Sequence, residues 1–397
     1  MSKYEQLVNF KTNLDFPRHN WFEIKEGYSA LLVSELIEEL NIKKDDGIIF
    51  DPFSGSGTTV LQSSLMGYKA IGVEVNPFLY FISKIKTTKF SNNFYNFFKK
   101  FNFNYPNNFD EIPKLSISKK LFGEQLNDVL MVKKYISEIK DEEIRNFLKL
   151  SFLCSLSSCA TAKKDGNGLK YPKNKIPKRF KEEFRNNTLQ FLNDSKTSKI
   201  LNKPLIYCSD SLGLVSDKKF KKKYSGKFSL VVFSPPYANC FDYTEVYKME
   251  LWFGDFIKSY PELKILRNKS LSSHLNKTID RKHFKFIKPY ISKLEKMDLW
   301  SNKIIPMLEN YFYEMYILIN NIKDLLSDGS TCVIVIGNSA YGNIAIPTDK
   351  IFCEIAKDCG YKDAYFKEAR KLGTSSQQYK KINNPKLLRE SLVYLKK

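Results

Sequence analysis

Two short loops carry the residues best suited to chemistry in this sequence. One reads Asp-Pro-Phe-Ser-Gly-Ser-Gly-Thr-Thr over residues 51–59, and the other reads Ser-Pro-Pro-Tyr over residues 234–237. Each follows a run of apolar, strand-like residues, Ile48–Phe50 and Leu230–Phe233. Because loops at the carboxyl ends of strands form the ligand crevice of an open α/β sheet, we expect the two loops to share one site.

The first loop has the features of a site for a nucleoside-containing cofactor. Gly55 and Gly57 let the backbone turn tightly and approach a ligand closely. A helix starting near Thr58 would point free N–H groups at a carboxylate or phosphate. Glu74 ends the next predicted strand, a position from which a carboxylate can accept both ribose hydroxyls. A nicotinamide-type loop would have a third glycine where this chain has Val60.

The second loop is suited to gripping a flat ring that bears an amino group. Such an amine is a poor nucleophile because its lone pair is delocalised into the ring. The Ser234 side chain and the Pro235 carbonyl could each accept one N–H bond and so localise that lone pair. Pro235 and Pro236 stiffen the loop before the ring arrives, and Tyr237 offers a surface on which it can stack.

Together the two loops resemble the signature of the S-adenosylmethionine-dependent DNA amino-methyltransferases, the N4-cytosine/N6-adenine family. The resemblance implies a doubly wound, Rossmann-like α/β methyltransferase sheet with large, mostly helical insertions. It also implies that Asp210 accepts from the adenine amino group, and that residues 21–29 close over the methionine end, where Lys25 and Ser29 would meet the carboxylate. The full cofactor set that follows is Lys25, Ser29, Asp51, Phe53, Gly55, Gly57, Thr58, Glu74 and Asp210, and the catalytic set is Ser234, Pro235, Pro236 and Tyr237.

The resemblance also bears on the target base. Ser-Pro-Pro-Tyr looks like the N4-cytosine members, whereas Asp or Asn in place of Ser234 is commoner among N6-adenine members, so adenine stays an alternative. No Pro-Cys dipeptide occurs at this loop, which disfavours the carbon-5 enzymes and their covalent mechanism. A base in duplex DNA must be flipped out of the helix to reach such a site.

Apolar periodicity divides the chain into a catalytic core and two interruptions. Core strands are expected at residues 47–51, 69–74, 204–210, 228–234, 330–337 and 391–395, with helices at 31–40, 58–66 and 307–326. The core is predicted to comprise residues 15–90, 203–254 and 302–397. Residues 91–202 are expected to be a helical insertion that recognises the target, with helix over 127–162 and a loop at 163–171. Residues 255–301 form a basic segment expected to contact DNA.

Composition is consistent with a nucleic-acid partner. The formal net charge is +21, from 64 Lys and Arg against 43 Asp and Glu, and a surplus of this size favours a polyanion such as double-stranded DNA. The basic loop at 163–181 is a candidate for phosphate contact. The seven Cys and three His show no zinc-ligand spacing, so no metal site is expected. Without an apolar signal region or membrane span, we expect a cytoplasmic protein.

The leading hypothesis is thus that the protein is the modification enzyme of a restriction–modification system. A cognate restriction endonuclease would be its partner in that system, and no direct contact between the two proteins is implied. Two alternatives stay open: an RNA amino-methyltransferase and a non-catalytic nucleic-acid-binding protein. RNA-modifying relatives usually carry an additional N-terminal domain, whereas about twenty residues precede Trp21 here. Intact Gly55, Gly57, Glu74, Ser234 and Tyr237 argue against loss of catalysis.

Overall fold

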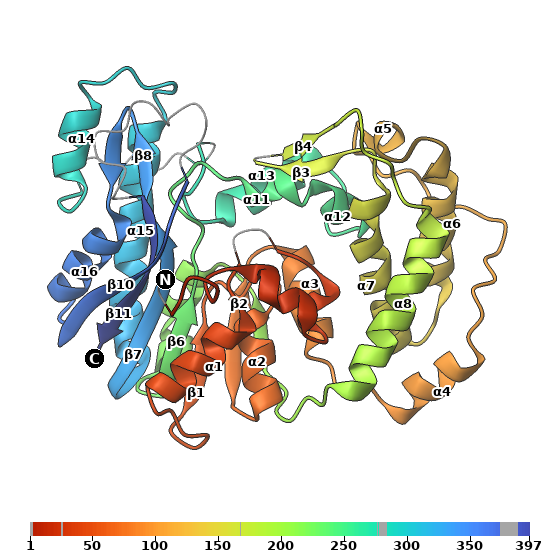
Figure 1. The fold of residues 1–397 in the computed structure, drawn as a ribbon, viewed down its shortest axis with the longest axis horizontal. Helices are drawn as coiled ribbons and strands as arrows, with labels where there is room; N and C mark the ends of the chain where they lie inside the picture. The colour runs from red at the N-terminus through yellow and green to blue at the C-terminus, as the bar shows by residue number, and fades with distance from the viewer. Residues whose placement is uncertain (1–2, 25–26, 167, 276, 278–283, 374–387) are drawn as a thin grey trace.

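A mixed sheet with helices packed on it fills the left and middle of the view in Figure 1. The computed structural model describes residues 3–24, 27–166, 168–275, 277, 284–373 and 388–397. Within these residues, seven strands pair in the order β10-β11-β7-β6-β1-β2-β5. Their bounds are β1 Ile48–Asp51, β2 Ala70–Glu74, β5 Leu205–Cys208, β6 Phe228–Phe233, β7 Leu326–Gly337, β10 Asp363–Lys371 and β11 Arg389–Lys396.

The strand order creates a ligand crevice beside β1. Pairing is parallel from β5 through β2, β1 and β6 to β7, whereas β11 is antiparallel to both of its neighbours. The chain builds outward from β1 to β5 and then returns to place β6 on the other side of β1. Such a reversal opens a crevice at the carboxyl ends of the strands. The predicted doubly wound α/β fold is confirmed.

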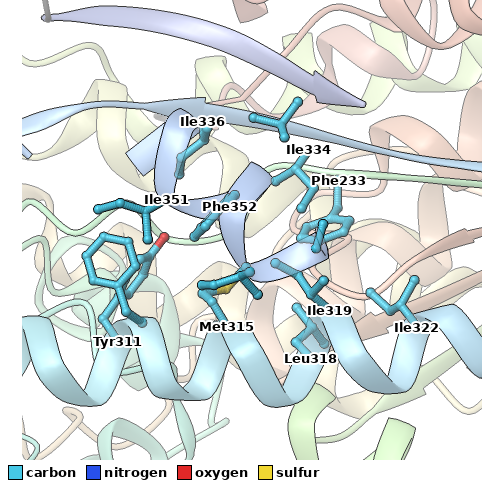
Figure 2. Packing of buried hydrophobic residues seen from close by; sticks show 14 of the residues in the cluster. Phe233, Tyr311, Met315, Leu318, Ile319, Ile322, Ile334, Ile336, Ile351 and Phe352 are labelled. Carbon is cyan, nitrogen blue, oxygen red and sulfur yellow. The ribbon is translucent and has the colours of Figure 1, made fainter. Parts of the chain in front are cut away.

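Alternating side chains of the strands face two different layers of helices. On one face Ile49, Val232 and Val333 pack in a cluster with α1 (Ala30–Glu39). On the other face the strand residues pack against α15 (Ile304–Leu325) and α16 (Thr348–Asp358). Figure 2 shows Phe233, Ile334 and Ile336 meeting Met315, Ile319 and Phe352 from these two helices. Both faces are therefore dry, as a largely parallel sheet requires.

Glycines begin and end the helix that follows the first loop. Helix α2 runs from Thr58 to Met66, as expected, with Gly57 and Gly67 in the left-handed region at its two ends. Gly67 donates to the carbonyls of Ser63 and Ser64, which satisfies the last turn. Helix α3 (Pro77–Lys86) then begins after Asn76, whose side chain caps the Phe78 N–H.

A helical lobe lies beside the sheet, at the right of Figure 1. Its helices are α4 Asn92–Lys100, α5 Ser118–Phe122, α6 Leu126–Glu138, α7 Glu142–Cys159 and α8 Phe180–Thr197. They share an apolar core with α3 and α12 (Lys248–Phe253), in which Phe147 is fully buried. Residues 127–162, expected to be largely helical, form two helices, because the chain is extended at Ile139 and Asp141. The expected loop at 163–171 contains a hairpin, β3 (Lys163–Asp165) with β4 (Gly168–Lys170).

Arg18 joins the two ends of this lobe. Its buried guanidinium donates to the carbonyls of Lys86 at 2.8 Å and Thr88 at 2.9 Å, where the chain leaves α3. It also donates to Ser198 Oγ at 2.8 Å and to the Ser195 carbonyl at 3.4 Å, where the chain leaves α8. One side chain therefore holds together two positions that are more than a hundred residues apart in sequence.

Shorter elements complete the described chain. They are the 3₁₀ helices η1 Phe10–Asp15, η2 His19–Trp21 and η3 Gly123–Gln125; the helices α9 Ser211–Ser216, α10 Lys218–Tyr224, α11 Tyr243–Val246, α13 Tyr260–Lys269 and α14 Lys288–Leu294; and the hairpin β8 Ser339–Tyr341 with β9 Ile344–Ile346. In the part of the chain that the structure describes, no helix has the length and apolarity needed to span a bilayer. No cluster of three or more metal-ligating side chains occurs in that part either.

Candidate functional site

A pocket lies where the carboxyl ends of β1, β2 and β6 meet. It encloses about 770 Å³ of empty space, part of which is open to solvent. Both predicted loops contribute to its wall, so the structure brings the two halves of the predicted site together. The sequence-predicted residues that line it are Asp51, Phe53, Gly55, Thr58, Glu74, Ser234 and Pro236.

The glycine loop turns where a side chain would not fit. Gly55 has φ +51°, and a Cβ there would lie 2.9 Å from Ile24 Cδ1. Gly57 has φ +89°, and a Cβ there would overlap Ser83. Gly57 itself does not line the pocket, and its role is to turn the chain into α2. The first N–H groups of α2, from Thr58 onward, are therefore presented beside the pocket and can receive an anionic group.

Glu74 holds the glycine loop against the second strand. Its Oε2 accepts from the Gly55 N–H at 2.8 Å, and its Oε1 accepts from the Asn76 N–H at 2.8 Å. Burial raises the pKa of this carboxyl to about 7, although the two backbone bonds act in the opposite direction. Each oxygen keeps a further lone pair for a hydroxyl donor in the pocket.

Asp51 stabilises the turn at the start of the glycine loop. Its Oδ1 accepts from the Phe53 N–H at 2.9 Å, and its Oδ2 accepts from the Tyr28 hydroxyl at 3.2 Å. Burial raises the pKa of Asp51 to about 7, while bonds from Thr59 and Phe53 lower it. The aromatic ring of Phe53 packs against Phe233 at 5.6 Å between centroids, which links the cofactor loop to the end of β6.

Asp210 lies in an adjoining pocket rather than in the first one. The two pockets share Val75 and Leu266 in their walls. Asp210 caps α9 by accepting from the N–H groups of Leu212 at 3.2 Å and Gly213 at 2.8 Å. A ligand that extends from the first pocket past Val75 would reach this carboxylate.

The predicted closing segment is only partly placed at the pocket. Ser29 is fully buried and caps α1, because its Oγ accepts from the Leu31 N–H at 3.1 Å and from Thr12 Oγ1 at 2.6 Å. It does not line the pocket, whereas Ile24, Gly27 and Tyr28 of the same segment do. Lys25 lies outside the described residues.

The Ser-Pro-Pro-Tyr loop presents two of its four residues to the pocket. Ser234 and Pro236 line it, whereas Pro235 and Tyr237 are buried behind them. The Tyr237 hydroxyl donates to Glu390 Oε1 at 2.5 Å and accepts from Ser234 Oγ at 3.3 Å. The base-stacking role expected of Tyr237 stays a prediction.

Several residues outside the predicted catalytic and cofactor sets also belong to the site. Tyr243 and Thr244 line the pocket, and the α11 segment that carries them is held by Arg267, which pairs with Asp242 at 2.7 Å and Glu245 at 2.7 Å. Aromatic residues are concentrated in residues 241–247, a few residues after Tyr237, and the sequence of this segment is compatible either with a wall of the pocket or with core packing. Glu390 had no local signal, since its contact with Tyr237 spans 153 residues.

Comparisons with known proteins support one family. A family model described as DNA methylase, of the N6 and N4 type, matches residues 27–85. The Type II methyltransferase M.AvaI of Nostoc sp. is 26% identical over 399 residues, which span 90% of this chain and 81% of the relative. M.BsoBI of Geobacillus stearothermophilus, also a Type II methyltransferase, is 26% identical over 458 residues, which span 98% of this chain and 88% of the relative.

Among solved structures, an rRNA methyltransferase from Streptomyces viridochromogenes matches with 9% identity and a TM-score of 0.33, covering 100% of this chain and 96% of its own. That score is too low to support a structural argument. The family model matched over residues 27–85 and the two relatives that are similar along most of the chain agree with each other: this chain is similar to DNA methylases of the N6/N4 type and to Type II methyltransferases.

Proposed function

We propose that this protein methylates an exocyclic amine of a base in double-stranded DNA, using S-adenosylmethionine, as the modification enzyme of a restriction–modification system. The observation that carries the proposal is the shared pocket, which is lined both by Ser234 and Pro236 of the Ser-Pro-Pro-Tyr loop and by Gly55 and Glu74. The likeness to two Type II methyltransferases supports the restriction–modification role.

The pocket residues fit each part of the cofactor. Glu74 would accept the ribose hydroxyls, the first N–H groups of α2 would receive the methionine carboxylate, and Asp210 would accept from the adenine amino group. When bound, S-adenosylmethionine supplies an electrophilic methyl group on sulfur. The chain then has to hold the amine in line with that methyl group, which is a positioning task more than an acid–base one.

Ser234 is the proposed acceptor for the target amine, and cytosine N4 is the proposed target. An N–H bond to Ser234 Oγ and a second to the Pro235 carbonyl would localise the amine lone pair. The serine in the first position of the Ser-Pro-Pro-Tyr loop favours cytosine. Adenine N6 is the alternative, and nucleoside analysis of the product distinguishes the two bases.

Basic side chains on the lobe are proposed to contact the DNA backbone. Within 163–181 the side chains of Lys170, Lys178 and Arg179 are 71%, 63% and 85% exposed. Lys164 and Lys175 of the same stretch instead turn inward, and Lys175 Nζ donates to the Ser157 carbonyl at 2.8 Å. The double variant Lys178→Ala with Arg179→Ala should weaken DNA binding. It should also reduce the slope of log K against log salt concentration by about one to two, since about one to two phosphate contacts are lost.

The decisive experiment measures tritium transfer from labelled S-adenosylmethionine to duplex DNA, followed by nucleoside analysis. Label in N4-methylcytosine is expected, and label in N6-methyladenine would overturn the base assignment alone. Label in transfer RNA with none in DNA would overturn the proposal. Ser234→Ala should lose most of the transfer, whereas Ser229→Ala, at a buried serine on the strand β6 that precedes the loop, should keep it.

A further inference from the structure

A chain of side chains runs from the catalytic loop to the last strand of the sheet. Ser234 Oγ donates to Tyr237 Oη at 3.3 Å, and Tyr237 Oη donates to Glu390 Oε1 at 2.5 Å. The other carboxylate oxygen of Glu390 accepts from Arg370 Nε at 2.6 Å. The chain thus connects a pocket-lining serine to an ion pair on β10 and β11.

The sheet fixes the position of this ion pair. Glu390 is 3% exposed and pairs in register with Gly337 on β7 and with Arg370 on β10. The Tyr237 ring lies directly on Gly337, where an added Cβ would be 2.9 Å from its Cε2 atom. Arg370 supplies the positive charge that a buried carboxylate needs. Tyr237 is therefore held at its ring by β7 and at its hydroxyl by β11.

The direction of these bonds matters for the amine. A serine hydroxyl has one hydrogen to donate and two lone pairs with which to accept. Because the carboxylate of Glu390 can only accept, the Tyr237 hydrogen is committed to it, and the Tyr237 oxygen is left to accept from Ser234. The Ser234 hydrogen then points away from the pocket, and its lone pairs are left for an N–H donor.

We propose that Glu390 is a positioning residue for methyl transfer, which orients Ser234 as an acceptor of the target amine by fixing the Tyr237 hydroxyl. This inference rests on the proposed function. It explains how a neutral serine, which could equally donate, is made to present acceptor lone pairs at this position. Glu390 itself touches neither cofactor nor base, and acts through Tyr237.

The test compares Glu390→Ala, Tyr237→Phe and the double variant Glu390→Gln with Arg370→Met in single-turnover methylation of duplex DNA. E390A and Y237F should each slow the methyl-transfer step roughly tenfold or more, because the acceptor loses its orientation. Affinity for S-adenosylmethionine, measured by calorimetry, should stay within about twofold of wild type, since neither side chain reaches the cofactor wall. E390Q combined with Arg370→Met should recover most of the rate, because the amide oxygen still accepts from Tyr237 and the amide N–H no longer faces the Arg370 donor.

Coupling between the two residues separates positioning from general stability. Adding E390A to Y237F should cause no further loss, because the bond that E390A removes is already absent. An additive loss, or an equal fall in cofactor affinity, would overturn the proposal. Lys367→Ala is the matched control, since Lys367 lies on the same strand as Arg370 but pairs with Glu39 at 2.5 Å, outside the catalytic loop.

A readout that needs no turnover keeps this inference distinct from the proposed function. Crystal structures should show the 234–237 loop displaced in E390A and unchanged in the double variant E390Q with R370M, and an unchanged loop in E390A would overturn the inference. A wild-type protein that transfers no methyl group to DNA would instead overturn the proposed function.

Discussion

Glu74 is placed under opposing demands by its surroundings. The side chain is 8% exposed, and burial disfavours its charge, so its pKa rises to about 7. Two backbone N–H groups favour the charged form, and a bound ribose would add two hydroxyl donors on the same side. Glu74 therefore titrates near neutrality, and under the proposed function the bound cofactor favours its ionised form.

Binding of S-adenosylmethionine should consequently weaken as the pH falls. With a pKa of about 7, Glu74 is mostly ionised at pH 8 and mostly protonated at pH 6, so we expect Kd to rise roughly tenfold between those two values. Calorimetric titration at both pH values measures this. Glu74→Gln should bind more weakly at pH 8 and show little pH dependence.

Asp51 provides the control for this interpretation, because its pKa is also about 7. Its carboxylate bonds to Phe53 and Tyr28 within the protein, and the proposed function assigns the ribose hydroxyls to Glu74. Asp51→Asn should therefore retain the pH dependence of binding. A flat pH profile in D51N together with a steep one in E74Q would show that Asp51, not Glu74, causes the pH dependence of binding.

At the scale of whole elements, the buried parallel strands were the most predictable part of the fold. The strands expected at 47–51, 69–74 and 228–234 agree with β1, β2 and β6 within one residue at each end. Continuous apolar runs bounded by turns leave few alternatives there. The edge strand β10 was missed because its sequence, Asp-Ala-Tyr-Phe-Lys-Glu-Ala-Arg-Lys, mixes charges with apolar residues, as expected of a strand with one open edge.

The candidate site was predictable only as far as its local motifs extend. Both loops and Glu74 were identified because glycine, proline and a strand-ending acid are local signals. The burial of Ser29 as a helix cap and the contact of Tyr237 with Glu390 depend on distant segments. The hairpin of β3 and β4 was missed for the same reason, because its lysine-rich sequence is held by partners elsewhere.

One buried ion pair fastens that hairpin. Lys164 of β3 bonds to Glu250 of α12, which is fully buried, and the ammonium lies 4.7 Å from the Tyr247 ring centroid. Lys164→Ala leaves the Glu250 carboxylate without its cation, so we expect a loss of about 3–5 kcal/mol in unfolding free energy. Chemical denaturation measures this loss, and Lys164→Met combined with Glu250→Gln should recover most of it.

Lys170 of β4 offers a matched control on the same hairpin. Its pair with Asp165 is exposed, at 71% and 53% of the two side chains, so Lys170→Ala should cost less than about 1 kcal/mol. An equal effect of K164A and K170A would show that the buried pair adds nothing to the attachment.

For the molecule as a whole, Lys86 makes the free energy of unfolding increase as the pH rises from neutral to alkaline values. This buried lysine donates to the His19 carbonyl at 3.1 Å, and burial lowers its pKa to about 7 from the ordinary 10.5. Between these values the unfolded chain binds the proton and the folded chain does not, so folding is favoured as pH rises. The penalty for the buried charge is fully present below pH 7.

Lys86→Met should therefore stabilise the protein most at neutral pH. We expect its Tm to exceed that of wild type at pH 7, and the difference to shrink as the pH approaches 10. Thermal unfolding followed by circular dichroism at several pH values measures this. Lys84→Met, at an exposed lysine on the same helix, should give a difference that does not change with pH.

The Arg18 contacts have a consequence for replacing the helical lobe with a lobe from another protein. Three of the four groups that Arg18 binds at the ends of the lobe are main-chain carbonyls, those of Lys86, Thr88 and Ser195. A main-chain carbonyl is present whatever the side chain, so the Arg18 contacts require few particular residues at the two ends of the lobe. Strands β2 and β5 pair directly although the whole lobe lies between them in sequence. A lobe of different sequence, with ends of the same backbone shape, could thus be grafted here without changing the sheet.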